Sequence, residues 1–258
     1  MLGIIAPHPP IIIPQIGKKE IKKIAKTVQA FLALNQEIVR DPPDTFIIIS
    51  PHGLIDPSHI TLRHPDKKIL EGGFSDFGAP EVRLAFHEDA SLTEKILDTP
   101  GFPGIASNHD HLDHGALVPL FFLTQRVPQA KLVSLTISYN SPKTHFEAGK
   151  ILQKTLIDDD KKIVFIASGD LSHRLIPTAP SGYSPQGKKF DTLIQKIIKT
   201  GDSQRLIELD GFFAEEAGEC GLRSIAFLMG LFHQSEAQQK ILSYEGPFGV
   251  GYLTVIFK

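Results

Sequence analysis

Short apolar runs rich in β-branched residues alternate along the chain with longer segments whose apolar positions recur at helical spacing. The runs have the length and composition of buried strands and lie at residues 2–6, 45–50, 131–137 and 162–168. Helical spacing appears between and after them, at residues 21–39, 91–97, 145–156, 188–198 and 221–232. Strands that alternate with helices predict an α/β fold, in which a largely parallel sheet is covered by helices on both faces.

The C-terminal pattern adds an antiparallel feature to this sheet. Residues 240–243 and 251–257 read as two strands joined by the glycine-rich turn EGPFGVG, which predicts a hairpin-like pair and therefore a mixed sheet. The longest irregular stretch, residues 65–81, contains three glycines and is interpreted as a mobile loop over a site. Without a repeat, a low-complexity segment or a linker, residues 1–258 are expected to form a single domain.

Composition narrows the classes of protein further. Apolar residues make up 41% of the chain and charged residues 22%, as in ordinary globular proteins. A net charge of -2 and the lack of a basic stripe argue against a nucleic-acid partner. One cysteine excludes an internal disulfide and fits a reducing compartment. No signal peptide or membrane span is evident, so we expect a soluble, cytoplasmic protein.

Two of the predicted strands end in the same unusual way. The first runs into IAPHPP and the second into ISPHG, so His8 and His52 each follow a proline directly after a strand. Proline ends a strand because it removes a backbone donor, and stiff loops at strand ends commonly carry site residues. Parallel strands place both histidines at the carboxyl edge of the sheet, where ligands bind. The pair predicts half of a metal site, although each histidine alone also fits a structural turn.

More histidines follow the later elements. The fourth strand ends in SGDLSHR, which puts His173 near the same edge, while Asp170 or Ser172 can also be read as caps of a following turn. The run HDHLDHGALVPL carries His109, His111 and His114 and lacks the cysteines of a zinc finger. Imidazoles beyond those needed as ligands indicate acid–base chemistry, because their pKa lies near neutral pH.

The ordered set of motifs resembles the class III extradiol ring-cleavage dioxygenases. The motifs are IAPHPP, SPHG, LDHGALVPL, SGDLSH, AEEAGECGLRS and SYEGPFGVGY, and they are dispersed over most of the chain. The likeness is to the LigB-type catalytic (beta) subunit and, more distantly, to the Memo family. It implies a non-haem Fe(II) enzyme that cleaves a catechol-type aromatic ring with O₂.

The resemblance also assigns roles to particular residues. It implies that His8 and His52 bind iron, that His173 is the acid–base histidine, and that His114 is a second catalytic histidine. The third ligand falls within AGECG, where dioxygenases use Glu and Memo proteins use Cys. Glu219 is preferred as this ligand, because oxygen-rich sites suit Fe(II) in O₂ chemistry, and Cys220 is the alternative. If the two residues lie on a helix, only one of the adjacent side chains can face the metal.

The choice between Glu219 and Cys220 as the third ligand leads to two hypotheses about function. The first is the extradiol dioxygenase, whose partners are a small aromatic diol and O₂. The second is a Memo-like metal-binding protein with a redox or signalling role and no ring cleavage, which Cys220 as a ligand would favour. A homo-oligomer or a small partner subunit, as in some relatives, is expected as the assembly, with no nucleic acid and no membrane. Metal-dependent hydrolysis by activated water is a third option.

Overall fold

The computed structural model describes residues 1–66, 68–108 and 111–258. Its strands are β1 (Leu2–Ala6), β2 (Thr45–Ser50), β3 (Ile60–Arg63), β4 (Ile69–Phe74), β5 (Ala79–His87), β6 (Gly104–Ser107), β7 (Lys131–Thr136), β8 (Ile163–Ser168), β9 (Gln239–Glu245) and β10 (Tyr252–Phe257). Its α-helices are α1 (Pro14–Gly17), α2 (Ala25–Arg40), α3 (Ala90–Leu97), α4 (His114–Leu123), α5 (Pro142–Leu156), α6 (Pro185–Thr200), α7 (Ser203–Ile207), α8 (Gly211–Ala217) and α9 (Leu222–Leu231). Three 3-10 helices are η1 (Pro10–Ile12), η2 (Lys18–Ile24) and η3 (Ser75–Phe77).

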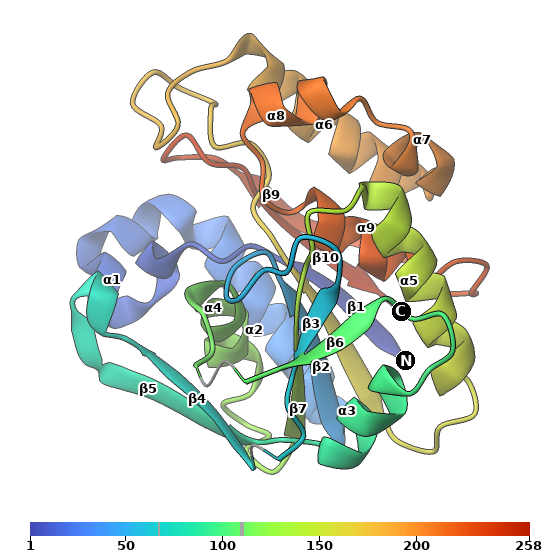
Figure 1. Cartoon of the computed structure of the whole chain (residues 1–258). Helices are drawn as coiled ribbons and strands as arrows, with labels where there is room; N and C mark the ends of the chain where they lie inside the picture. The colour runs from blue at the N-terminus through green and yellow to red at the C-terminus, as the bar shows by residue number, and fades with distance from the viewer. Residues whose placement is uncertain (67, 109–110) are drawn as a thin grey trace.

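Within the described residues, eight strands form one sheet in the order β6-β3-β7-β2-β8-β1-β10-β9 (Figure 1). The central strands β7, β2, β8 and β1 are parallel to one another. Strand β10 pairs antiparallel with β1, and β9 pairs antiparallel with β10. The predicted class is therefore confirmed: a single α/β domain with a mixed, mostly parallel sheet, and an antiparallel pair at the C-terminus.

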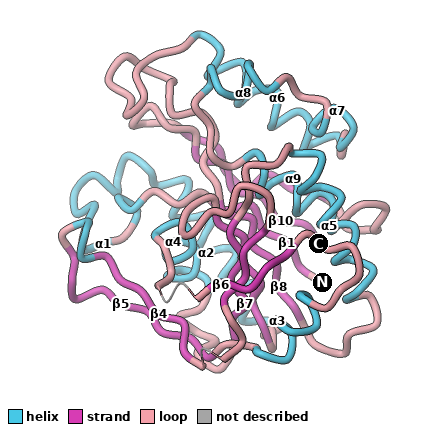
Figure 2. Tube along the Cα trace, viewed as in Figure 1, coloured by secondary structure: helices cyan, strands magenta, loops and turns pink. Residues whose placement is uncertain are grey.

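Helices cover both faces of this sheet (Figure 2). Alternate residues of a strand point to opposite faces, so Ile47 and Ile49 pack with α5 and α9, whereas Ile48 packs with α2 and α4. Because each central strand is buried on both faces, it reads as a continuous apolar run, and this is why these strands were recognisable in the sequence. No helix among the described residues is long and apolar enough to cross a membrane.

The prediction of an irregular loop at residues 65–81 is wrong. Strand β4, the short helix η3 and the beginning of β5 occupy most of this stretch, and β4 and β5 pair antiparallel as a separate two-stranded sheet. Gly72 explains how the hairpin fits against the domain: a Cβ there would lie 2.6 Å from the Leu112 carbonyl oxygen. Glycines favour irregular structure in a local pattern, but Gly72 permits close backbone approach inside a strand.

Candidate metal and acid–base site

His8 is held rigidly in the loop that follows β1. Its backbone N–H donates to Asp170 Oδ1 (2.9 Å), and its ring Nδ1 lies 2.9 Å from Ser168 Oγ. The side chain is buried, with 2% of the residue exposed. The flanking prolines fix φ on both sides of the loop, so backbone stiffness and two hydrogen bonds determine where the imidazole lies.

His52 emerges from the end of β2 at the same edge of the sheet. Strands β1 and β2 both pair in parallel with β8, which lies between them, so their ends bring the two histidines together. The Nε2 atoms of His8 and His52 lie 3.1 Å apart. Two ring nitrogens at this distance are stable only with a proton or a cation shared between their lone pairs. The predicted meeting of His8 and His52 at the carboxyl edge is confirmed.

Cys220 completes a group of three donor atoms. Its Sγ lies 3.7 Å from His8 Nε2, and the ligand atoms of His8, His52 and Cys220 all lie within 4.8 Å of one another. Metal–nitrogen and metal–sulfur bonds of about 2.0–2.3 Å place neighbouring ligand atoms at separations of this order. The residues therefore fit a divalent metal ion bound by two imidazoles and one thiolate.

Glu219 is not part of this group of donor atoms. Glu219 and Cys220 lie between α8 and α9 and not on a helix, so the argument from helical geometry does not apply to them. The carboxylate of Glu219 accepts a hydrogen bond from the Leu222 backbone N–H (2.6 Å) at the start of α9. Burial raises the pKa of this carboxyl to about 7. The structure thus groups the alternative residue, Cys220, with the histidines, while ligation by Glu219 stays an untested prediction.

Without a cation the thiol of Cys220 is protonated. Burial, followed by the nearby Asp170 and Glu219 carboxyls, raises its pKa well above the ordinary value. The Asp170 backbone N–H approaches Sγ at 3.3 Å, a contact that favours negative charge on sulfur. A bound metal ion would supply the charge that a thiolate needs, since metal coordination deprotonates thiols.

His114 lies beside the two paired histidines. It is the first residue of α4, whose N-cap Asp113 accepts hydrogen bonds from the Ala116 N–H and from Ser50 Oγ. The His114 ring stacks on His52, with centroids 4.4 Å apart, and meets the His8 ring edge-on at 5.5 Å. The ring of Phe77 in η3 also contacts His114, with centroids 5.2 Å apart and the planes tilted by 58°. Burial lowers the pKa of His114, which favours the neutral imidazole.

His173 approaches the site from the loop after β8. Its Nδ1 lies 2.6 Å from the Gly218 carbonyl oxygen, which can only accept, so Nδ1 carries the proton. Its Nε2 is then free to accept a proton and lies 3.9 Å from Asp170 Oδ2. Burial is the main cause that lowers the pKa of His173, and 22% of its side chain is exposed. These features suit a proton acceptor that a ligand can reach.

Asp170 has a larger part in the site than the sequence indicated. Its carboxylate binds the His8 backbone, and its Oδ2 lies 4.0 Å from His8 Nε2 and 3.9 Å from His173 Nε2. Burial raises its pKa to about 7. The reading of this residue as a turn cap missed these contacts, and the signal that could have revealed them was its position directly after a strand that ends beside those of His8 and His52.

His111, another member of the histidine-rich run, is not among the rings that contact His8 and His52. His111 is exposed and its backbone forms an isolated bridge with Glu71, while His109 lies outside the described residues. Gly115, the residue after His114, allows close approach of β2 and its loop: a Cβ there would lie 2.5 Å from Ser50 Oγ and 3.0 Å from the His52 ring.

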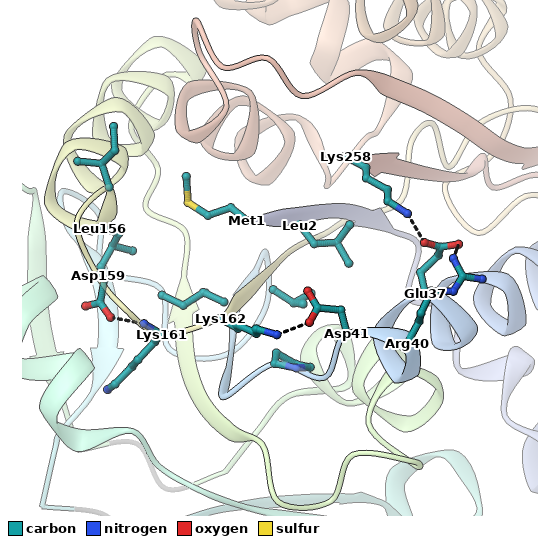
Figure 3. Close-up of a pocket in the computed structure, with 14 residues that line it drawn as sticks. Met1, Leu2, Glu37, Arg40, Asp41, Leu156, Asp159, Lys161, Lys162 and Lys258 are labelled. Atoms are coloured by element: carbon teal, nitrogen blue, oxygen red, sulfur yellow. Dashed lines mark hydrogen bonds and ion pairs between the residues drawn. The ribbon is translucent and has the colours of Figure 1, made fainter.

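A separate cavity of about 450 Å³ lies at the opposite edge of the sheet, near the beginnings of β1 and β8 (Figure 3). Its charged lining residues are paired with one another or with nearby acids: Lys162 with Asp41, Lys258 and Arg40 with Glu37, and Lys161 with the buried Asp89. Arg40 and Lys258 share the one carboxylate of Glu37, so these pairs neutralise most, but not all, of the positive charge of the described lining.

The chain resembles known proteins over most of its length. Residues 2–255 match the family described as the catalytic LigB subunit of aromatic ring-opening dioxygenase. Protein CA_C1420 of Clostridium acetobutylicum is 37% identical over 258 residues, an alignment that covers 95% of this chain and 55% of that protein. The chain thus spans about half the length of this curated relative.

A solved structure shows the same fold. The crystal structure of the uncharacterized protein JW3007 from Escherichia coli K12 has a TM-score of 0.69 with 15% sequence identity, and the match covers 100% of both chains. At this identity the likeness concerns the fold alone. The family match extends over nearly the whole chain and includes every element that carries the histidine cluster, so the chain belongs to the LigB family of catalytic subunits of aromatic ring-opening dioxygenases.

Proposed function

We propose that the chain is a metal-dependent dioxygenase that opens the ring of a small aromatic diol with O₂. The observation that carries the proposal is the convergence of four imidazoles, from His8, His52, His114 and His173, at one sheet edge of a LigB-family protein. His8, His52 and Cys220 would hold the metal. When bound, a divalent metal ion lowers the pKa of a coordinated hydroxyl group and provides a site at which O₂ can react.

The residues of the chain would bind and deprotonate the diol. His173 is neutral near pH 7 because burial lowers its pKa, and its free Nε2 can take a proton from a substrate hydroxyl. Asp170 lies close enough to that nitrogen to stabilise the imidazolium that results. His114, stacked on His52, offers a second neutral imidazole beside the pair.

The donor set bears on which metal is used. The family resemblance implies Fe(II), held by two histidines and a carboxylate, whereas a thiolate ligand favours softer or redox-active metals. The position of Cys220 therefore supports a second candidate function, a metal-binding protein with a redox role and no ring cleavage. The two functions differ in whether a diol is consumed together with O₂.

Purification without oxygen, followed by metal analysis and an oxygen-uptake assay, tests the proposal. Protein loaded with Fe(II) is expected to consume one O₂ per molecule of catechol or 3,4-dihydroxybenzoate, with a new absorbance from the ring-opened product. Resorcinol, whose hydroxyls are not adjacent, serves as the control substrate. Stoichiometric metal without diol-dependent oxygen uptake over a panel of catechols would favour the redox metal-binding function instead.

The His8 and His52 assignments need a matched control. His8→Ala and His52→Ala are expected to lose bound metal, whereas His233→Ala, which removes a histidine packed against Phe146 away from the cluster, retains it. Full metal occupancy in either of the first two variants would remove that residue from the ligand set.

A further inference from the structure

Helix α4 contains a proline that leaves one of its own carbonyls without the usual partner. Pro119 lies inside the helix, where its backbone N–H would otherwise donate to the carbonyl four residues earlier. That carbonyl belongs to Gly115, which is buried. A buried carbonyl without a donor is unfavourable, so a donor from outside the helix is needed.

Ser168, the last residue of β8, supplies this donor. Its hydroxyl donates to the Gly115 carbonyl oxygen, and Ser168 is fully buried. The same Oγ lies 2.9 Å from His8 Nδ1. Ser168 therefore connects a carbonyl of α4 to the ring of a proposed metal ligand.

The direction of these two hydrogen bonds follows from proton counting. A serine hydroxyl has one proton to donate, and a carbonyl oxygen can only accept. The Ser168 hydroxyl proton is donated to the Gly115 carbonyl oxygen, so Oγ can only accept a hydrogen bond from His8. The neutral His8 ring therefore carries its proton on Nδ1. Nε2 then carries the lone pair, and it is this nitrogen that lies 3.1 Å from His52 Nε2 and 3.7 Å from Cys220 Sγ.

We propose that Ser168 is a positioning residue that fixes the tautomer of His8, with Pro119 leaving the Gly115 carbonyl free to orient the Ser168 hydroxyl. The opposite arrangement, with Ser168 donating to His8, would leave the Gly115 carbonyl without that donor and place the His8 proton on Nε2, between the proposed ligands. The assignment of the His8 tautomer depends only on the hydrogen bonds of Ser168, whereas the role of that tautomer in metal binding rests on the proposed function.

The tautomer can be measured directly in metal-free protein. Long-range ¹H–¹⁵N NMR of ¹⁵N-histidine protein, treated with a chelator at a pH where His8 is neutral, distinguishes protonated from unprotonated ring nitrogens. His8→Gln assigns the signal. We expect wild-type protein to show His8 protonated at Nδ1, and Ser168→Ala to shift the population toward protonation at Nε2. The control is Ser243→Ala, which removes a buried hydroxyl on β9 that has no hydrogen-bond partner within the described residues.

Metal affinity provides the second readout. Residues that orient a metal-bound histidine typically contribute about 10–100-fold in affinity, so titration of Zn²⁺ into Ser168→Ala is expected to show a loss of that order, with Ser243→Ala unchanged. Ser168→Cys, nearly the same size but a weak donor, is expected to fall between wild type and Ser168→Ala, and it replaces the alanine variant should that variant not fold.

The outcomes separate the tautomer from the metal site. A wild-type His8 protonated at Nε2, or an Nδ1–H tautomer that persists in Ser168→Ala, overturns the role of Ser168. A shifted tautomer combined with unchanged Zn²⁺ affinity supports that role and instead removes His8 from the proposed ligand set. A shifted tautomer with weaker Zn²⁺ binding supports both.

Discussion

At the scale of single residues, the site depends on how polar side chains are buried and oriented. His8 and His173 each have a fixed proton on Nδ1, because Ser168 and the Gly218 carbonyl respectively accept from it. The unprotonated nitrogens therefore face the interior of the site. Burial lowers the pKa of both imidazoles, so the neutral forms needed for ligation and proton acceptance are present at neutral pH.

Replacing His173 is expected to impair turnover without releasing the metal. His173→Gln keeps a polar side chain but cannot accept a proton to form a cation, and a general base typically contributes roughly 10²–10⁴-fold to the rate. Oxygen uptake with the best catechol of the panel, measured together with metal content, tests this. Unchanged turnover at full metal occupancy would show that His173 serves only to hold the loop through its bond to Gly218.

The choice of third ligand is expected to favour Cys220. Cys220→Ser should weaken metal binding strongly, whereas Glu219→Gln should retain it, because the Glu219 carboxylate is bound to the start of α9. Substitution with Co²⁺ should give a sulfur-to-metal charge-transfer band that Cys220→Ser lacks. The reverse pattern, with metal lost in Glu219→Gln and no such band in wild type, would restore the carboxylate ligand set.

His145 is expected to make stability depend on pH. Its ring is fully buried, with Nδ1 bonded to the Ser141 carbonyl and Nε2 accepting from the Ser138 N–H. Burial is the main cause that lowers its pKa from 6.5 to about 4. Since the unfolded chain takes up the proton first, His145 stabilises the fold fully above pH 6.5, and this contribution is lost as pH falls toward 4.

Urea unfolding at several pH values measures this effect. Between pH 7 and pH 4.5 we expect the wild type to lose about 2–3 kcal/mol more unfolding free energy than His145→Gln, because the variant lacks the titrating group. Parallel pH curves for the two proteins would contradict the assignment of a neutral, hydrogen-bonded His145 in the folded state.

At the scale of secondary-structure elements, glycines determine how closely some elements approach. Helices α5 and α9 pack against each other with Gly149 and Gly230 at the contact: a Cβ on Gly149 would lie 2.1 Å from the Phe227 carbonyl oxygen, and one on Gly230 would lie 2.0 Å from that of Phe146. Helix α9 begins two residues after Cys220, so this packing also positions the loop that carries the proposed thiolate ligand.

Gly149→Ala is therefore expected to force the two helices apart. Overpacking of a buried contact costs about 1–3 kcal/mol, and the obstacle here is backbone, which cannot rotate away as a side chain can. Gly211→Ala at the start of α8 is the matched control, because a Cβ there meets no atom within 4 Å. Thermal unfolding should show a clear loss for the first variant and little change for the second; equal melting temperatures would mean that the α5–α9 contact is looser than described.

At the scale of the whole molecule, the site joins distant parts of the chain. His8 and His52 follow β1 and β2 on either side of β8, while Cys220 reaches them from the segment before α9. An ion held by all three would tie these segments together in the folded state only. Ligand binding of this kind stabilises a protein by about 2.7 kcal/mol at a ligand concentration of 100 times Kd.

Metal addition is thus expected to raise the melting temperature of chelator-treated protein. Zn²⁺ or Fe²⁺ under anaerobic conditions should increase it in a concentration-dependent way, and His52→Ala should show no such increase. Because His52 is not fully buried and lies beyond its strand, the variant should still fold, so its unfolding curve without metal is the reference. An equal increase in both proteins would indicate that the ion binds elsewhere.

Much of the α/β fold could be predicted because central strands buried on both faces leave an unmistakable local pattern. The predicted strand at residues 45–50 matches β2. The two strand–Pro–His motifs correctly predicted that His8 and His52 lie side by side. Proline after an apolar run acts through local backbone geometry, which depends on neighbouring residues only. Helical spacing at residues 188–198 and the apolar runs around the glycine-rich turn likewise predict helix α6 and the C-terminal strand pair from local pattern alone.

The tertiary structure decided what depends on contacts between distant residues. The sequence does not show that Gly72 approaches Leu112, and so its pattern predicts a loop where the structure has the β4–β5 hairpin. Glu219 and Cys220 are adjacent and equally suitable by chemistry, but the Leu222 N–H draws the carboxylate to α9 while the thiol lies beside His8. The bonds that orient Ser168, Asp170 and His173 likewise join segments far apart in the chain. Local pattern determined which residues end at the sheet edge, and long-range packing determined which atoms face one another there.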